Sequence, residues 1–148
     1  MKAHFSLTKR VEFADTDAAG IMHFSNYFRF MEICEHAFVR SLGFSVFPAE
    51  GDGAAVGWPR VQVACDYRLP LYFEDEVKIE LVVKKLSSKT IDYEFLFWKK
   101  GGDLGKTNLV ASGKFTVICV AWRGEGQKMK AVEIPSKMRE QLEGVRIK

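Results

Sequence analysis

Apolar and polar residues alternate along several stretches of this chain, and one long stretch repeats with the period of a helix instead. Residues 5–13 alternate, with Phe5, Leu7, Val11 and Phe13 on one side of the pattern. A period of two predicts a strand that buries one face. The small and acidic residues at 14–20 interrupt the alternation, so we expect a loop there.

From Ser25 onward the apolar residues recur at intervals of three and four. This apolar stripe consists of Tyr27, Met31, Cys34, Phe38 and Leu42. Charged residues take the opposite face, as in an amphipathic helix. Because Ser25 is a suitable N-cap and Gly43 a suitable residue after the C-cap, the pattern predicts one long helix between them.

Four further strand-like runs follow an unpatterned segment at residues 44–60. The runs cover residues 61–68, 77–85, 90–98 and 108–122. One face of the second run carries Val77, Ile79, Leu81 and Val83, and one face of the third carries Ile91, Tyr93, Phe95 and Phe97. Residues 86–89 and 99–103 are typical of hairpin connections, and a short helix is expected after Pro135.

The order of elements is therefore one strand, one long helix and four more strands. An antiparallel sheet wrapped around the helix is the arrangement that buries the wide apolar stripe. We predict an α+β fold in which a curved antiparallel β-sheet wraps around one long central α-helix. A length of 148 residues suits a single domain, which we place at residues 1–148.

Positions predicted to face outward in the last two runs are also apolar, which suggests that copies of the chain associate. These positions are Leu96, Trp98, Ile118 and Val120. Exposed apolar surface of this kind favours contact with another subunit. We expect a homodimer, and a homotetramer if dimers pair through this outer surface.

Composition and charge limit the binding partners and the cellular compartment that we expect for this protein. The net charge is +3, and the basic residues are scattered, which argues against nucleic acid as a partner and suits a small anionic ligand. The three cysteines are far apart and form no disulfide framework or zinc motif. The N-terminus lacks the apolar core of a signal peptide, and no apolar run is long enough for a membrane span. We therefore expect a cytoplasmic protein.

The most informative segment is residues 11–27, VEFADTDAAGIMHFSNY. Its pattern D-x-D-x-x-G-[IV]-[VM], followed by Tyr27 in the opening turn of a helix, resembles the signature of the 4-hydroxybenzoyl-CoA thioesterase family. That family includes the acyl-CoA thioesterases associated with the Tol-Pal system. The resemblance continues at residues 57–59 and 131–135 and covers nearly the whole chain. It implies the hotdog fold, hydrolysis of an acyl-CoA to free acid and CoA, and no cofactor.

The resemblance implies that Asp17 is the catalytic carboxylate, acting either as the nucleophile or as the general base that activates water. Backbone amides at the start of the following helix can stabilise the oxyanion that forms on the thioester carbonyl. We place the oxyanion and pocket residues at Gly20, His23, Phe24 and Tyr27, with no metal ion. Gly20 is expected to adopt a positive φ or to allow close approach of the substrate.

Two other positions near the motif have different expected roles. Asp15 is interpreted as an acceptor that organises the loop. His23 departs from relatives that carry a histidine one position later, where this chain has Phe24. An amide donor at position 24 requires no particular side chain, so the expected oxyanion role does not depend on this difference.

Coenzyme A carries phosphates that need cations or backbone amides as partners. In the family, the hairpin between the third and fourth strands supplies these contacts. The matching hairpin here contains Ser87, Ser88 and Lys89, which we predict to bind CoA. We expect each site to combine residues of two chains.

Three alternatives remain open from the sequence. Asp15, Asp17 and His23 could together hold a divalent metal ion. A hotdog dehydratase is a second enzymatic alternative, although it would use a catalytic histidine where the motif offers a carboxylate. A non-catalytic acyl-CoA-binding hotdog protein is the third alternative, and the presence of Asp17 argues against it.

Overall fold

The structure, a computed structural model, describes residues 2–47, 56–101, 108–121 and 128–148. Its elements in chain order are β1 (Phe5–Arg10), a short 3-10 turn (Phe13–Asp15), α1 (Asn26–Ser41), β2 (Val56–Gly57), β3 (Arg60–Tyr67), β4 (Glu76–Leu86), β5 (Thr90–Lys99), β6 (Leu109–Ile118), β7 (Val120–Ala121), β8 (Lys130–Ala131) and α2 (Ser136–Ile147). The predicted helix and strands are therefore present, with bounds that differ by a few residues.

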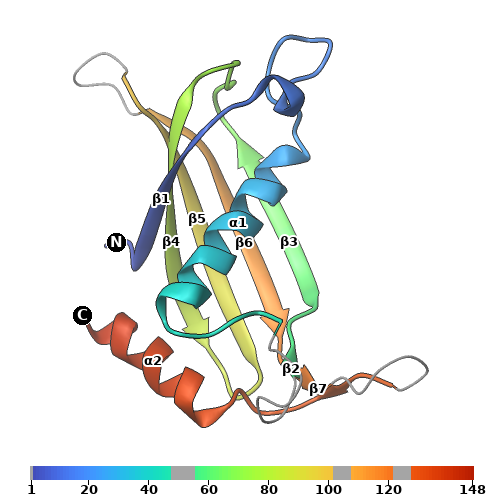
Figure 1. The fold of residues 1–148 in the computed structure, drawn as a ribbon, viewed down its shortest axis with the longest axis vertical. Coiled ribbons are helices and arrows are strands. Elements are labelled where there is room, and N and C mark those ends of the chain that lie inside the picture. The colour runs from blue at the N-terminus through green and yellow to red at the C-terminus, as the bar shows by residue number, and fades with distance from the viewer. Residues whose placement is uncertain (1, 48–55, 102–107, 122–127) are drawn as a thin grey trace.

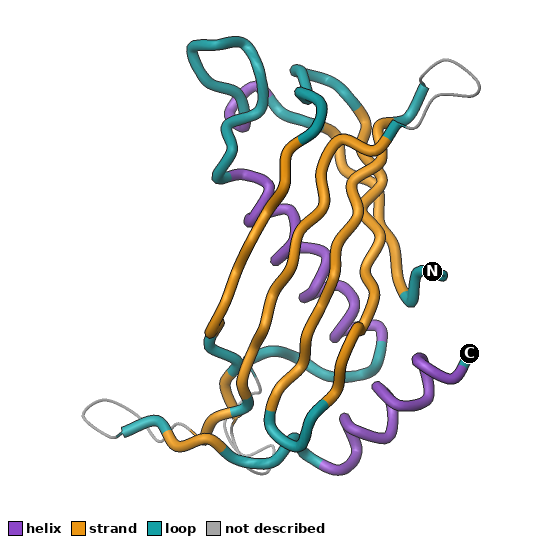
Figure 2. The backbone as a smooth tube through the Cα atoms, turned by 180° about the vertical axis from the view of Figure 1, so that it is seen from behind, coloured by secondary structure: helices purple, strands orange, loops and turns teal. Residues whose placement is uncertain are grey.

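Five strands form one antiparallel sheet in the order β1-β4-β5-β6-β3. Figure 1 shows α1 lying across one face of this sheet, and Figure 2 shows the sheet from behind, with α1 beyond it. The short strands β2, β7 and β8 form a second small sheet at the end of the molecule near the C-terminus of α1. The predicted α+β arrangement of a sheet around one long helix is confirmed.

The core lies between α1 and the sheet. Tyr27, Met31, Cys34 and Phe38 of the predicted helical stripe are at most 3% exposed. The predicted inward rows of β4 and β5 are likewise buried. Full burial of such an apolar side chain contributes about 1.5–3 kcal/mol, so this contact provides much of the driving force for the fold.

Two details of the predicted strands are wrong. The first strand ends at Arg10, and Phe13 lies in the 3-10 turn with 77% of its surface exposed. The chain turns there because the side chain of Asp15 accepts a hydrogen bond from the Glu12 amide, at 2.8 Å. The run at 108–122 is interrupted after β6, and Val120, predicted to face outward, is buried in β7.

The sheet has one exposed edge with an apolar surface. β3 pairs with β6 on one side, and the described residues provide no strand for its other side. Along this edge Val61, Val63 and Tyr67 are 58%, 46% and 45% exposed. Unpaired strand edges with apolar side chains are sites where further strands add.

The C-terminal helix α2 closes the end of the molecule that lies near the C-terminus of α1. It buries Met138 and Leu142, and Pro135 precedes its first residue, as predicted. Within the described parts of the chain, neither helix has the length and apolar character needed to span a lipid bilayer.

Close packing between α1 and β6 leads to a testable prediction. A Cβ atom at Gly113 would overlap the end of the buried Met31 side chain. The Gly113→Ala variant should therefore lower the free energy of unfolding by about 1–3 kcal/mol, as measured by urea denaturation.

Gly144 of α2 provides the matched control, because no atom lies within 4 Å of a Cβ built there. Gly144→Ala should raise the free energy of unfolding by about 0.5–1 kcal/mol, since alanine is the better helix former. Equal stability of the two variants would contradict the proposed overlap with Met31.

Candidate active site

Asp15 organises the loop that connects β1 to α1. Its side chain is buried, and Oδ2 accepts the hydrogen bond from the Glu12 amide. Its carbonyl oxygen accepts hydrogen bonds from the His23 amide at 2.9 Å and from Asn26 Nδ2 at 2.8 Å. The carbonyl thus connects the beginning of the loop to the beginning of the helix. The interpretation of Asp15 as an organising acceptor is confirmed.

Asp17 lies in the exposed part of the same loop. Its amide donates to the Ile21 carbonyl at 3.1 Å, and its Oδ1 accepts from the Ala19 amide at 2.8 Å. Gly20 closes the turn with φ +81°, so the predicted positive φ is confirmed. Within the described structure, Asp17 Oδ2 accepts no hydrogen bond from a protein donor. This oxygen is available to a substrate or to water.

Asp17 borders an open hollow of about 520 Å³. Residues Phe13, Thr16, Ala18, Gly20 and Phe73 complete its lining. The rings of Phe13 and Phe73 meet edge to face, with centroids 5.9 Å apart, and both are at least half exposed. Analysis of the sequence missed this pair because it assigned Phe13 to the buried face of a strand and Phe73 to no element.

The segment just before α1 presents an unused amide. The Asn26 amide donates to the His23 carbonyl at 3.0 Å, and the Ser25 amide donates to His23 Nδ1 at 3.3 Å. No described residue accepts a hydrogen bond from the Phe24 amide. Ser25 occupies the predicted N-cap position, but its Oγ bonds with His23 Nδ1 at 2.7 Å and makes no cap.

Tyr67 of β3 attaches the start of α1 to the sheet. The Tyr67 hydroxyl donates to the Phe24 carbonyl at 2.9 Å, and the Tyr67 ring packs edge to face on Tyr27, with centroids 4.9 Å apart. Burial raises the pKa of Tyr27 to about 12, so its hydroxyl stays protonated at neutral pH. Tyr27 is therefore a buried core side chain that does not line the hollow beside Asp17, and it is unsuited to exchange protons there.

The predicted CoA-binding hairpin lies at the other end of the sheet from Asp17 (Figure 1). β4 starts beside the loop of Asp17, where the Val11 amide donates to the Asp75 carbonyl at 2.8 Å. The strand then runs for 11 residues, or roughly 35 Å, before it reaches Ser87. One chain thus does not bring Ser87, Ser88 and Lys89 together with its own Asp17.

Residues near the C-terminus donate hydrogen bonds to the backbone of this hairpin. Arg139 of α2 donates hydrogen bonds to the Ser87 and Ser88 carbonyls, and the Ile134 amide donates to the Ser88 carbonyl at 2.9 Å. Lys89 is exposed, and none of the acidic groups that the structure describes forms an ion pair with it. The arrangement leaves the Lys89 ammonium group available to an anion. Analysis of the sequence did not single out Arg139, because its role depends on where α2 packs.

Asp15, Asp17 and His23 do not form the metal-ligand group that one alternative required. Asp15 is buried, and its carboxylate faces the Glu12 amide. Across the described residues, no three His, Cys, Asp or Glu side chains are grouped closely enough to hold a metal ion.

Comparison with known proteins identifies the family of this chain. Residues 11–142 match the model of the thioesterase-like superfamily. A relative from Aquifex aeolicus is 33% identical over 118 residues, which make up 77% of this chain and 91% of the relative. A 1,4-dihydroxy-2-naphthoyl-CoA hydrolase of Prochlorococcus marinus (strain NATL2A) is 30% identical over 109 residues, 70% of each chain.

A solved structure extends the agreement to the fold. A gentisyl-coenzyme A thioesterase superposes with a TM-score of 0.76 at 30% identity, covering 93% of this chain and 99% of the other. The sheet around one helix is thus the hotdog fold. The chain belongs to the thioesterase-like superfamily, and it is a thioester hydrolase.

Proposed function

We propose that this protein hydrolyses acyl-CoA thioesters to a free acid and CoA, with Asp17 as the catalytic carboxylate. The observation that carries the proposal is the combination of a free carboxylate oxygen on Asp17 and an unused amide at Phe24 within one connected loop. A carboxylate and an amide donor are the groups that acyl transfer to water requires.

The reaction follows from these two groups. Asp17 takes a proton from a water molecule, and the resulting hydroxide attacks the thioester carbonyl carbon. The carbonyl oxygen becomes an oxyanion, which the Phe24 amide and the positive end of α1 stabilise. The C–S bond then breaks, and the thiolate of CoA takes up a proton. In the alternative, Asp17 attacks the carbonyl carbon directly and the C–S bond breaks, which releases the thiolate of CoA and leaves an acyl-enzyme anhydride that water hydrolyses.

The hollow beside Asp17 supports an apolar acyl group as part of the substrate. The exposed rings of Phe13 and Phe73 offer flat apolar walls next to the carboxylate. The names of the two relatives above specify aromatic acyl groups, naphthoyl and gentisyl. We therefore propose aromatic acyl-CoA thioesters as the first substrates to examine.

We also propose that the active form is a homodimer joined through β3. This edge lacks a partner strand among the described residues, and its exposed valines are apolar. The other edge of the sheet, β1, carries Lys9 and Arg10, and charged side chains discourage strand addition. Two identical strands related by a two-fold axis perpendicular to the sheet pair antiparallel.

Antiparallel pairing through β3 would unite the two separated halves of the site. Because the partner runs in the opposite direction, its hairpin of Ser87, Ser88 and Lys89 would lie toward the end where Asp17 lies. A tetramer would need the outer face of the sheet. There Leu96, Trp98 and Ile118 are partly exposed, and the charged Glu94 lies among them.

Replacing Asp17 tests the catalytic role. Asp17→Asn should fold and bind acyl-CoA but lose turnover by about 100-fold or more, because an amide neither attacks the thioester nor accepts a proton. Release of free thiol from aromatic acyl-CoA thioesters measures the loss. Near-normal turnover would contradict the mechanism.

Asp15→Asn is the matched control in the same loop. Because Asp15 is buried and bonded to the Glu12 amide, its replacement should lower the thermal midpoint of unfolding more than Asp17→Asn does. Its effect on turnover should be the smaller of the two.

Mixing two impaired variants tests the shared site. Lys89→Ala should weaken acyl-CoA binding and spare turnover at saturation, because it would touch the nucleotide only. Heterodimers of Asp17→Asn with Lys89→Ala should regain one intact site if the two residues come from different chains. Recovery of rate at low substrate concentration is the expected result. No recovery despite demonstrated subunit exchange would place both residues in one chain's site.

A further inference from the structure

The two peptide groups that flank Phe24 are both held by hydrogen bonds. In the group between His23 and Phe24, the carbonyl accepts from the Asn26 amide at 3.0 Å. In the group between Phe24 and Ser25, the amide donates to His23 Nδ1 at 3.3 Å. The carbonyl of this second group accepts from the Tyr67 hydroxyl at 2.9 Å. The direction in which the unused Phe24 amide points therefore depends on these three bonds.

The bond from Tyr67 differs from the other two because its donor lies in the sheet. The other two bonds join residues of the same short segment, whereas Tyr67 lies in β3 and is 43 residues away from Phe24 in the sequence. A second bond to the chain that follows β3 lies just upstream, where the Met22 amide donates to the Leu71 carbonyl at 2.7 Å. The segment is thus fixed relative to the sheet on both sides of the Phe24 amide.

The Phe24 carbonyl has no place in the hydrogen-bond ladder of the helix. In a continuous α-helix this carbonyl would accept from the amide four residues later, which is that of Phe28. The Phe28 amide donates instead to the Ser25 carbonyl, at 3.2 Å. Among the described residues, the Tyr67 hydroxyl is therefore the donor that satisfies the Phe24 carbonyl.

The Tyr67 ring is itself supported by the core. It packs edge to face on Tyr27, which is buried and whose ring in turn contacts Phe97, with centroids 5.5 Å apart. Burial raises the pKa of Tyr67 to about 12, so its hydroxyl stays protonated at neutral pH and remains a donor. Tyr67 thus combines a ring held by aromatic neighbours with a hydroxyl directed at the Phe24 carbonyl.

We propose that Tyr67 is a positioning residue for the oxyanion donor: its hydroxyl holds the Phe24 segment so that the Phe24 amide points at the thioester carbonyl oxygen. Tyr67 acts through the Phe24 backbone and does not touch the substrate. A donor that is already oriented stabilises the oxyanion without reorganisation during the reaction. This role rests on the function proposed above, because it requires the Phe24 amide to serve as an oxyanion donor.

Tyr67→Phe removes the hydroxyl and keeps the ring that packs on Tyr27. The rate of a single turnover on an aromatic acyl-CoA should fall by about threefold to tenfold, as expected for the loss of one neutral hydrogen bond. The KM should stay within about twofold, because ground-state binding does not use the hydroxyl. An unchanged rate, or a raised KM with an unchanged rate, would overturn the proposal.

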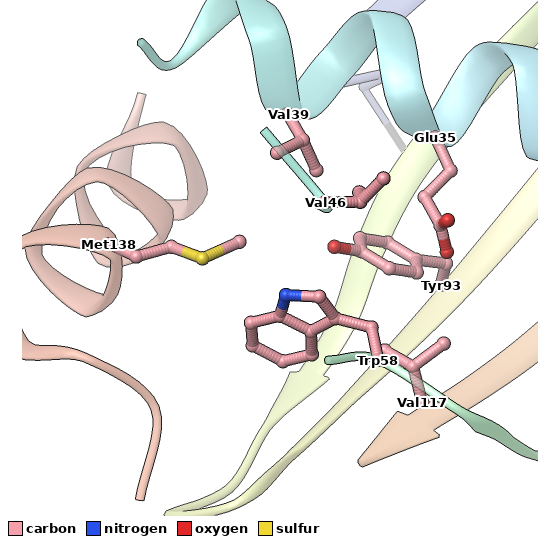
Figure 3. A pocket seen from close by; sticks show the side chains of 7 residues that line it. All are labelled: Glu35, Val39, Val46, Trp58, Tyr93, Val117 and Met138. Atoms are coloured by element: carbon pink, nitrogen blue, oxygen red, sulfur yellow. The ribbon is translucent and has the colours of Figure 1, made fainter. Parts of the chain in front are cut away.

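Tyr72→Phe is the matched control. Tyr72 is 50% exposed, similar to Tyr67 at 45%, and no described residue forms a hydrogen bond with its hydroxyl. Tyr93 is less suitable because it is buried in the core beside Glu35 (Figure 3). Tyr72→Phe should keep the single-turnover rate of the unmodified protein. Equal losses in the two phenylalanine variants would overturn the proposal.

Two further replacements of Tyr67 separate the donor from the shape of the side chain. p-Aminophenylalanine at this position offers an N–H donor in place of the hydroxyl, whereas p-methoxyphenylalanine offers an oxygen without a hydrogen to donate. The amino variant should keep most of the single-turnover rate, and the methoxy variant should be at least as slow as Tyr67→Phe. Because Tyr67 lies in β3, sedimentation should show the same mass for all variants. An amino variant no faster than the methoxy variant would overturn the proposal.

Nuclear magnetic resonance tests the positioning without any reaction. The ¹⁵N order parameter of the Phe24 amide should fall in Tyr67→Phe and stay unchanged in Tyr72→Phe, because only the first variant frees the Phe24 carbonyl. A lower turnover with an unchanged order parameter would overturn the positioning role. If the unmodified protein hydrolyses no acyl-CoA, the proposed function and the oxyanion role fail together, whereas a lowered order parameter would still show that Tyr67 anchors the segment.

Discussion

The structure depends on the burial of one face of α1 against a curved antiparallel sheet. Tyr27, Met31, Cys34 and Phe38 have no other way to leave water, and the inward rows of β4 and β5 have no other cover. This contact sets the position of the whole helix. The start of the helix therefore lies at the end of the sheet where β1 and β3 meet their loops, and the loop of Asp17 is held there.

One helix cannot cover five strands, and this limit shapes the functional surface. β3 lies at the edge of the sheet, and its inward side chains Val63 and Tyr67 stay about half exposed. The two ends of the molecule also differ in chemistry. The end with Asp17 carries an acidic loop and an open hollow, whereas the other end carries the exposed Lys89 and the hairpin held by Arg139. The proposed catalytic carboxylate and the proposed phosphate-binding cation are thus kept apart within one chain.

The ion pair of Glu35 with Arg60 stands out because stability alone does not account for it. Replacing a buried ion pair by apolar residues of similar volume is often neutral or stabilising. Here the carboxylate is deeply buried, and one of its oxygens has no partner among the described residues. The guanidinium of Arg60 lies 4.5 Å from the centre of the Phe115 ring, which gives the cation a second contact. Arg60 thus contacts both the buried carboxylate and an aromatic ring of the core.

The sequence by itself determined the elements and the local chemistry of the loop. The helical stripe and the alternating runs are local repeats of period 3.6 and 2, and these predict which faces are buried. The positive φ at Gly20 and the organising role of Asp15 also follow from nearby residues, within one turn. Only the tertiary structure decided which distant residues meet. The Phe73 ring contacts the Phe13 ring, Arg139 donates a hydrogen bond to the Ser87 carbonyl, and Arg60 pairs with Glu35. The two residues of each pair are too far apart in the sequence for a local pattern to predict their contact. Packing against the sheet decides which side of α1 is buried, and Glu35 lies on that side. This packing outweighs the preference of a carboxylate for water, because Arg60 contacts Glu35.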